Sequence, residues 1–386
     1  MNRIGVLHLT DTLDAGGAER VAVNIVNHLP RERYSAHLCT TRREGPLADL
    51  VAADVGRLCL NRQRRFDVGA LQRLVAFIRD HDLHILHAHG ASLFTAVLAA
   101  FLPPHPVVIW HVHFPKYASD DRPILLYRLL ARRAGGVIAA SRPLAEWCWS
   151  RQRVPIDRVW YLPNFVCPAK DDGQPDTLPG PRGGRIVCIA NFRSQKDHLT
   201  LVHAMALVVQ HAPAAHLLLV GAPSDRAYVN RVATEITRQG LDRHVSLLGQ
   251  RTDVPSILKA CEVGVLSSAS EGFPLALLEY GMAGLPSVAT STGQCSEILD
   301  DGGAGILVPP RSPHRLAEAL LELIQSPARR TALGEQLRRR VQEKYCPDAV
   351  MERICWVYEH VLGITEGRKS SKGRSPRQPD WIREGG

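Results

Sequence analysis

Short apolar runs alternate with helical patterns along most of this 386-residue chain, and this alternation constrains the fold more than any other feature. Continuous apolar strands separated by helices are typical of a parallel sheet that helices cover on both faces. The strands expected in the first half are 3–10, 35–41, 83–89, 106–113, 136–140 and 159–163. The helices expected between them include 17–29 and 67–80. A doubly wound α/β domain is therefore predicted.

One stretch interrupts the alternation. Residues 166–184, VCPAKDDGQPDTLPGPRGG, are dense in Pro, Gly and Asp and lack periodicity, which indicates a linker. The alternation then restarts, with strands expected at 184–190, 216–221, 245–249, 263–268, 286–290 and 305–309 and helices at 197–212 and 312–325. Two doubly wound Rossmann-like domains are therefore predicted. Ligands of such sheets bind at the carboxyl ends of the strands, which predicts a site in an interdomain cleft.

Composition narrows the classes of function. The formal net charge is +9, and the segment 366–386 contributes +3 of it through six Lys/Arg against three Asp/Glu. This polar composition predicts a disordered tail. The sequence contains no nucleic-acid-binding motif with interleaved aromatic residues, so no nucleic-acid partner is expected, and the basic charge suits anionic lipids or phosphorylated ligands.

Three further features predict a cytoplasmic protein. The nine cysteines include no C-x-x-C pair, which suits a reducing compartment. The first ten residues, MNRIGVLHLT, do not read as a secretory signal. The longest apolar run, 93–102, is about half of the ~20 residues that span a bilayer, so we expect a buried helix there.

Two features follow strands of the first half. Gly16 and Gly17 open a helix, where backbone amide groups and the positive helix end favour an anion, although the G-x-G-x-x-G spacing of a dinucleotide site is lacking. His111 and His113 point to one face of the sheet, so one or both are expected at its carboxyl edge. The histidines of HAHG (87–90) are placed similarly. No carboxylate or cysteine lies at ligand spacing, so no metal is expected.

The second half contains a basic loop between a strand and a helix. Arg193 and Lys196 lie three positions apart in IANFRSQKDH (189–198), near a helix start, where the dipole disfavours cations. This placement indicates either an anion bound between the two cations and the helix end, or a solvated basic loop.

The stretch SEGFPLALLE (270–279) is expected to run from a loop into a helix, with Pro274 in the first turn. Glu271 and Glu279 lie eight positions apart, at most about 12 Å along a helix axis. They lie along one helix start, whereas the paired carboxylates of glycosidases face each other. We therefore expect them to accept hydrogen bonds from hydroxyls at two ends of one ligand, with an anion at the amide groups of 272–275. A polyol, an anion and a second polyol together describe a nucleoside diphosphate sugar.

From residue 3 to about 345 the chain resembles the retaining glycosyltransferases of family 4, which have the GT-B fold. The most specific part is SEGFPLALLEYGMAGLPSVAT (270–290), which resembles the family's E-x7-E segment. GGAER (16–20), LPNFV (162–166) and STGQCSEIL with DGGAGILVPP (291–310) follow the family's order. The resemblance implies sugar transfer from a UDP- or GDP-linked donor to a saccharide or lipid-linked acceptor, as in bacterial surface polysaccharide or glycolipid synthesis. It implies retention of configuration without a metal or other cofactor.

The resemblance also implies a role for each candidate residue. Glu279 would hold the ribose hydroxyls of the donor and Glu271 the hydroxyls of its sugar. Arg193 and Lys196 would bind the diphosphate and stabilise its charge as it leaves. The further donor-binding residues that the resemblance implies are Gly16, Gly17, Asn191, Gly272, Phe273, Pro274 and Leu275.

A strand-end histidine of the family contacts the transferred sugar, and His113 fits this position better than His111. One departure concerns the basic loop, where Ala190 and Asn191 replace the Gly-Arg that the family often has. Arg193 is expected to supply the displaced guanidinium.

The predicted organisation therefore has five parts. They are an acceptor-side N-terminal Rossmann-like domain (1–165), a linker (166–183), a nucleotide-sugar-binding Rossmann-like domain (184–345), a helix returning to the first domain (346–364) and a basic tail (365–386).

Segment 122–136 combines apolar residues with four arginines. It is either a basic amphipathic helix that touches an anionic membrane weakly, which would make the protein peripheral at the inner membrane, or a core-facing helix with a solvated basic face. Two other functions stay open on the same architecture. One is a sugar-nucleotide epimerase, which would need further carboxylates in the cleft, and the other is a sugar-nucleotide-binding protein without catalysis.

Overall fold

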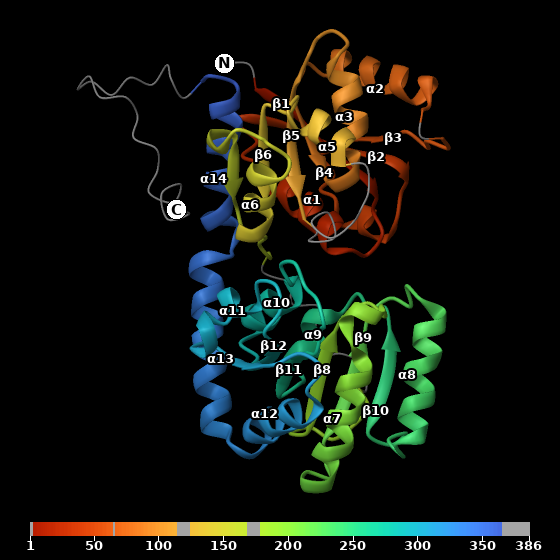
Figure 1. Ribbon diagram of the computed structural model, residues 1–386, viewed down its shortest axis with the longest axis vertical. Coiled ribbons are helices and arrows are strands. Elements are labelled where there is room, and N and C mark those ends of the chain that lie inside the picture. Colours follow the sequence, from red (N-terminus) through yellow and green to blue (C-terminus); the bar gives the residue numbers. More distant parts are fainter. Residues whose placement is uncertain (1–2, 65, 114–123, 168–177, 365–386) are drawn as a thin grey trace, which may run out of the picture. The chain divides into compact units, whose positions relative to one another are not determined.

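The computed structural model describes residues 3–64, 66–113, 124–167 and 178–364 (Figure 1). The chain divides into two compact units, of which unit 1 comprises Met1–Phe165 with the C-terminal segment from Pro347, and unit 2 comprises Val166–Cys346. The predicted tail, most of the predicted linker and the start of the basic segment 122–136 lie outside the described residues.

Unit 1 is built on a parallel sheet. Among its described residues the strand order is β3-β2-β1-β4-β5-β6-β7, which reverses direction between β1 and β4. The strands are β1 (Ile4–Thr12), β2 (Tyr34–Arg43), β3 (Gly56–Cys59), β4 (Leu83–His89), β5 (Val107–Val112), β6 (Gly136–Ala139) and β7 (Val159–Tyr161). The α-helices are α1 (Gly17–His28), α2 (Val68–Asp80), α3 (Leu93–Ala100), α5 (Ile124–Ala131), α6 (Arg142–Ser150) and α14 (Pro347–Val361).

The two faces of this sheet differ in chemistry. On one face, Leu7 of β1, Leu86 of β4 and Trp110 of β5 belong to an apolar core that includes residues of α2 and α3. Neighbouring positions along a strand point to opposite faces, so His8 and His87 lie on the other face. There α14 packs against α1, and the buried residues of α14 face the sheet. The helix that follows unit 2 in sequence is thus part of unit 1.

Unit 2 repeats this topology. Its described strands are parallel in the order β10-β9-β8-β11-β12-β13, with a reversal between β8 and β11. The strands are β8 (Arg185–Ile189), β9 (His216–Val220), β10 (Val245–Gly249), β11 (Val263–Leu266), β12 (Ser287–Thr290) and β13 (Ile306–Val308). The α-helices are α7 (His198–His211), α8 (Arg226–Arg238), α9 (Val254–Lys259), α10 (Leu275–Ala283), α11 (Cys295–Ile298), α12 (Pro313–Gln325) and α13 (Pro327–Lys344). Two doubly wound α/β units are therefore confirmed.

A few local predictions were wrong. β3 is absent from the expected strands, because GRLC is a four-residue edge strand that includes the exposed Arg57 and carries no apolar run. Pro274 was expected inside the first turn of α10. It precedes the helix instead, since its ψ of 107° is extended and the helix begins at Leu275.

Candidate active site

The reversal of strand order in unit 2 places two loops side by side. β8 and β11 are hydrogen-bonded neighbours, and the loop after β8 carries Arg193 and Lys196 while the loop after β11 carries Glu271. Parallel strands end at the same edge of a sheet, so residues 75 positions apart in sequence meet there. A ligand site at such a reversal is the general expectation for doubly wound sheets.

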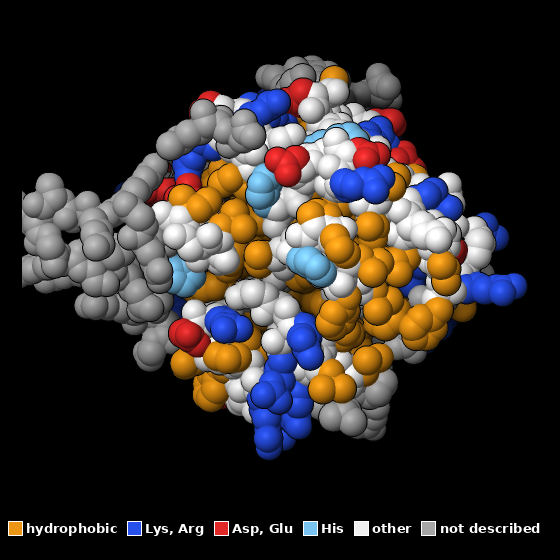
Figure 2. Space-filling view, turned by 90° about the horizontal axis from the view of Figure 1, so that it is seen from above, with side chains coloured by type: hydrophobic (Ala, Val, Ile, Leu, Met, Phe, Trp, Pro, Cys, Tyr) orange, Lys and Arg blue, Asp and Glu red, His pale blue; other side chains and the backbone are white. Residues whose placement is uncertain are grey.

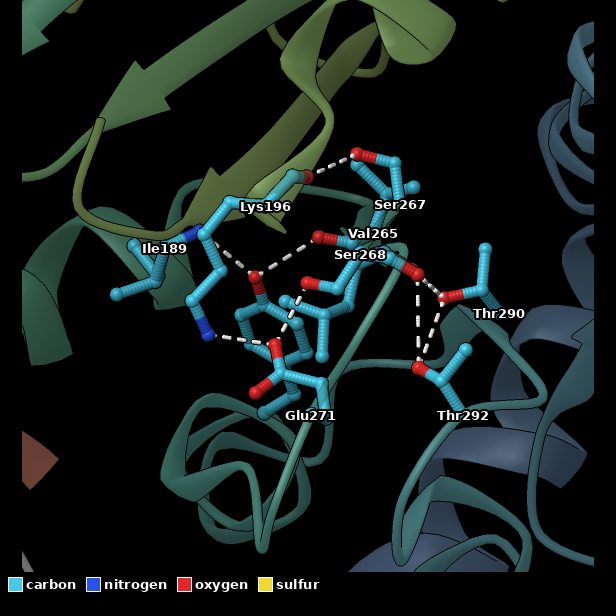
Figure 3. A network of polar contacts seen from close by, with 10 residues as sticks. Ile189, Lys196, Val265, Ser267, Ser268, Glu271, Thr290 and Thr292 are labelled. Atoms are coloured by element: carbon cyan, nitrogen blue, oxygen red, sulfur yellow. Dashed lines mark hydrogen bonds and ion pairs between the residues drawn. The ribbon is translucent and has the colours of Figure 1, made fainter. Parts of the chain in front are cut away.

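Lys196 and Glu271 form an ion pair at this edge (Figure 3). Lys196 Nζ lies 2.5 Å from Glu271 Oε1, and Ser268 Oγ donates to the same oxygen at 2.6 Å. The Glu271 side chain is only 7% exposed and that of Lys196 21%. A carboxylate this buried needs both a cation and a hydrogen-bond donor, because desolvation penalises its charge. The structure thus joins two residues that the sequence predicted as separate contacts, for a diphosphate and for a sugar.

Hydroxyl side chains fix the loops that carry this pair (Figure 3). Ser267 Oγ donates to the carbonyls of Lys196 and Asp197 at 3.1 and 3.2 Å. Thr290 Oγ1, at the end of β12, donates to the carbonyl of Ser268 at 2.6 Å. Three strand ends are therefore tied together behind the ion pair.

Tyr280 of α10 joins two of these strands, β8 and β11. Its buried hydroxyl accepts a hydrogen bond from the Ile189 amide at 2.8 Å and lies 3.2 Å from the Val265 carbonyl, to which it donates. Burial raises the pKa of Tyr280 well above its ordinary value, so the group keeps its proton. Ser268, Thr290 and Tyr280 were missed by sequence reasoning, although the Ser-Ser pair at the end of VGVLSS was a visible signal.

Arg193 is exposed, and within the described residues its guanidinium has no ion-pair partner. It precedes a short 3-10 turn, Ser194–Lys196, that leads to Asp197. The Asp197 carboxylate caps α7 by accepting from the Thr200 amide at 3.3 Å and from its hydroxyl at 2.7 Å. This cap fixes the backbone that presents both cations.

Asn191 has a structural role. Its side-chain carbonyl accepts from the Ala222 amide at 2.9 Å and so joins the loop after β8 to the loop after β9. The predicted contact of Asn191 with a donor stays a prediction.

The turn before α10 contains the other predicted donor-binding residues. Phe273 is buried and packs edge-on against Tyr345, with ring centroids 5.6 Å apart. Gly272 accepts from the Gln294 amide at 2.9 Å through its carbonyl. No described side chain caps the start of α10 at Pro274 and Leu275, so its first amide groups lack that partner. A helix start of this kind favours an anion.

Glu279 lies half-buried near the middle of α10. With a rise of ~1.5 Å per residue, it is about 6 Å along the axis from Leu275. The two glutamates of the predicted motif therefore lie on either side of the helix start, as the sequence suggested.

In unit 1, α1 begins at Gly17, and Gly16 has an extended backbone that any residue adopts. A Cβ at Gly17 would meet no described atom within 4 Å, whereas one at Gly16 would clash with Glu19 Oε2. The Glu19 carboxylate thus covers Gly16 at the helix start, where the helix dipole stabilises its negative charge. An anion approaching these glycines would have to displace it.

His111 is the next-to-last residue of β5 and His113 follows the strand, both buried. Burial lowers the pKa of His113 to about 3 and that of His111 well below its ordinary value. Both are therefore neutral near pH 7. Within the described residues, Nδ1 of His113 and Nε2 of His111 have no hydrogen-bond partner.

The histidines of unit 1 also bear on the expectation of no metal. Two groups of three ring nitrogens lie close enough together to hold an ion, His8/His87/His89 and His89/His111/His113. Among described residues neither group contains a carboxylate or thiolate. Neighbouring rings also lie at hydrogen-bond distance from each other, 2.9–3.1 Å, and within the described residues only His113 Nδ1 and His111 Nε2 of these rings lack a partner. His8 was missed because a single histidine in an apolar strand gives no signal.

Comparison with known proteins agrees with the fold. Residues 183–326 match the family described as "Glycosyl transferases group 1", and residues 15–170 match the "Glycosyltransferase Family 4" description. The fold resembles that of HepE from Anabaena, solved in complex with UDP and glucose, with a TM-score of 0.78, 19% identity and coverage of 93% of this chain and 100% of the other. The chain is thus a glycosyltransferase of the GT-B fold.

The chain is also similar to the UDP-Gal:alpha-D-GlcNAc-diphosphoundecaprenol alpha-1,3-galactosyltransferase of Escherichia coli, 27% identical over 332 residues, covering 80% of this chain and 84% of the relative. A mannosyltransferase of lipopolysaccharide core biosynthesis from Rhizobium leguminosarum is 27% identical over 253 residues, covering 64% and 70%. The first half of the chain thus carries the match to glycosyltransferase family 4, and most of the second half carries the match to the group 1 glycosyl transferases.

Proposed function

We propose that this protein transfers a sugar, with retention of configuration, from a UDP- or GDP-linked donor to a saccharide or lipid-linked acceptor. The observation that carries the proposal is the buried Lys196–Glu271 ion pair at the strand-order reversal of unit 2, in the loop that also carries Arg193, whose guanidinium has no ion-pair partner within the described residues. The names of the relatives support the substrate classes, since one uses UDP-Gal and acts on a diphosphoundecaprenol-linked sugar.

In this proposal the diphosphate of the donor binds Arg193, Lys196 and the amide groups at the start of α10. The arriving negative charge competes with Glu271 for Lys196, so the carboxylate is released to accept from a hydroxyl of the transferred sugar. Glu279 holds the ribose hydroxyls, one helical turn away. Binding of the donor thus redistributes one cation between two anions.

The chemical step follows from the same charges. As the bond between sugar and phosphate breaks, negative charge grows on the leaving diphosphate, and fixed cations stabilise it most at that moment. The leaving phosphate accepts the proton of the acceptor hydroxyl, which attacks from the same face of the sugar. Arg193 and Lys196 take the part that a metal ion plays elsewhere, so no metal is needed. His113 and the Gly16-Gly17 turn of unit 1 contact the sugar and the phosphates.

A lipid-linked acceptor would require contact with a membrane surface, and we propose α5 as part of it. Tyr127 and Leu130 pack on the core of unit 1, while Leu129 is 55% exposed beside the exposed Arg132 and Arg133. Figure 2 shows one face of the molecule on which hydrophobic side chains gather among Lys and Arg. Among the described helices, none combines the length and apolar character that crossing a bilayer requires. We propose that this contact is peripheral, at the inner face of the membrane.

The function is tested with a panel of UDP- and GDP-sugars. The matching donor should raise the melting temperature, since a ligand that binds only the native state at 100 times its Kd stabilises by about 2.7 kcal/mol. Incubation with that donor should release nucleoside diphosphate, slowly with water and faster with an acceptor. Donor binding without turnover would contradict the proposal in favour of a binding protein, and isomerisation of the donor sugar would contradict it in favour of an epimerase.

A further inference from the structure

The described histidines on one face of the unit 1 sheet form a single hydrogen-bonded chain. They come from three adjacent strands and are each at most 5% exposed. Their rings stack closely, with centroids 4.0 Å apart for His111 and His113 and 4.4 Å apart for His8 and His87. Tyr358 of α14, fully buried, closes the chain from the helix that covers this face.

Each link of the chain joins two ring nitrogens or a ring nitrogen and the tyrosine hydroxyl. The links are His113 Nε2 to His89 Nδ1 (2.9 Å), His89 Nε2 to His8 Nδ1 (3.0 Å), His8 Nε2 to Tyr358 Oη (3.1 Å), Tyr358 Oη to His87 Nδ1 (2.6 Å) and His87 Nε2 to His111 Nδ1 (3.1 Å). Both ends are nitrogens that, among described residues, have no partner: Nδ1 of His113 and Nε2 of His111.

The proton count restricts the arrangement. A neutral imidazole has one N–H and one bare nitrogen, so an inner ring that donates at one nitrogen accepts at the other. The hydrogen bonds on each side of Tyr358 therefore share one direction. The Tyr358 hydroxyl has one proton but can accept more than one hydrogen bond, so it donates to at most one of His8 and His87.

The distances at Tyr358 select the direction. With an oxygen acceptor, a hydroxyl donor gives a shorter contact than an N–H donor, with modes near 2.7–2.8 Å and 2.9–3.0 Å, and we apply the same order here. The 2.6 Å contact is therefore the hydroxyl donating to His87, and the 3.1 Å contact is the His8 N–H donating to the hydroxyl. Following the chain from His8 through His89, the proton of His113 lies on Nε2, and its Nδ1 is a bare acceptor.

We propose that Tyr358, through His8 and His89, is a positioning residue that locks His113 in the Nε2–H form, so that Nδ1 accepts a hydrogen bond from a hydroxyl of the transferred sugar. The hydrogen bond from the sugar hydroxyl rests on the proposed function. The fixed Nε2–H form of His113, called the lock below, does not.

Two observations support neutral, metal-free rings. Burial lowers the pKa of His8 to about 3, as it does for His113, so near pH 7 neither ring takes a second proton that would break the one-way pattern. A bound ion would have to replace links that are already at hydrogen-bond distance.

The lock is tested by nuclear magnetic resonance of protein selectively labelled with 15N-histidine, which reports the protonated nitrogen of each ring. In the wild type near pH 7, His113 should show a protonated Nε2 and a bare Nδ1. Tyr358→Phe removes the hydroxyl, so His113 should populate both forms. Tyr34→Phe is the matched control, because Tyr34 is equally buried and lies beside Tyr358 but its hydroxyl faces the Cys355 carbonyl at 3.4 Å. It should leave the pattern unchanged.

A wild-type His113 protonated on Nδ1 would overturn the lock, and this readout does not depend on how well the variants fold. An unchanged pattern in Tyr358→Phe would also overturn it. So would a stoichiometric metal in the purified protein that is lost in His89→Ala.

Turnover separates the lock from the proposed function. Tyr358→Phe should lower kcat about two- to tenfold, the reciprocal of the fraction of His113 left in the competent form, while Tyr34→Phe should not. If the ring protons shift as expected but kcat stays the same, the lock stands and the contact of His113 with the sugar is wrong.

Discussion

The two units share one strand order but hold different chemistry at its reversal. In unit 2 the loops after β8 and β11 bury an ion pair, Lys196–Glu271, which is held by a serine hydroxyl. In unit 1 the strands on either side of the reversal, β1 and β4, bury His8, His87 and His89 with no carboxylate among them. A buried charge persists only with an opposite charge and hydrogen bonds, whereas imidazoles without a counter-charge lose their protons. The same topology thus supplies charge in one unit and neutral hydrogen-bonding groups in the other.

The largest expected effect is on kcat, when the positive charge of Lys196 is removed from unit 2. Lys196→Gln keeps a donor for Glu271 but loses the cation that stabilises the leaving diphosphate. We expect kcat to fall about 10²–10³-fold, as when one preorganised electrostatic contact is removed from an active site. Lys259→Ala, at the exposed end of α9, is the control and should keep wild-type turnover. A Lys196→Gln enzyme with more than a tenth of wild-type kcat would argue against a catalytic charge here.

The next largest expected effect is a pH dependence of the stability of unit 1. His8 and His113 have folded-state pKa values of about 3 against 6.5 for the free side chain, so below pH 6.5 the unfolded state binds more protons than the folded state. Stability contributed by each ring is therefore present above pH 6.5 and falls by about 1.4 kcal/mol per pH unit on acidification toward pH 3. Hydrogen exchange of β1, β4 and β5, corrected for the intrinsic pH dependence, should show this loss.

Unit 2 serves as the internal reference for that experiment. Among its described histidines, burial lowers the pKa of His198 to about 4. Unit 2 should therefore also lose stability on acidification, but less than unit 1, because fewer of its histidines take up a proton. A variant of an exposed ring, His105→Ala, should follow the wild-type curve. If strands β8 and β11 lose protection faster than β1 and β4 on acidification, the contrast between neutral and charged units is wrong.

The smallest expected effect is on the melting temperature, when the Tyr280 hydroxyl that joins β8 to β11 is removed. Tyr280→Phe leaves the partly buried Ile189 amide without its acceptor, which costs about 1–3 kcal/mol. At about 2–4 °C per kcal/mol for a domain of this size, the melting temperature should fall by a few degrees. Tyr34→Phe, which removes only a long contact, should change it less. Equal shifts in the two variants would mean that the Tyr280 hydroxyl has no special part in holding β8 against β11.

Much of the architecture was predictable because it depends on local patterns. The segments at 245–249 and 83–89 coincide with β10 and β4, since short stretches rich in Val, Ile and Leu between polar turns have few other uses. The edge strand β3 was not predictable, because an edge strand buries little and needs no such run. The order of strands in each sheet is likewise a property of long-range pairing.

The candidate site was predictable as a set of residue types but not as contacts. Arg193, Lys196 and Glu271 were found from their positions after apolar runs. Their charges gave no indication that Lys196 pairs with Glu271, because that contact depends on β8 lying beside β11. His8 gave no signal at all, since its role appears only once three strands place their rings in one stack.

The central claim is that Lys196 is shared between Glu271 and the diphosphate of the donor. It is tested most directly by calorimetric titration of the nucleoside diphosphate into the wild type, Lys196→Gln and Glu271→Gln. Removing the cation should weaken binding, and removing its competing carboxylate should strengthen binding, each by about tenfold, or 1.4 kcal/mol. Shifts of opposite sign are the predicted result. Affinities that stay at the wild-type value in both variants, or that fall in both, would contradict the account.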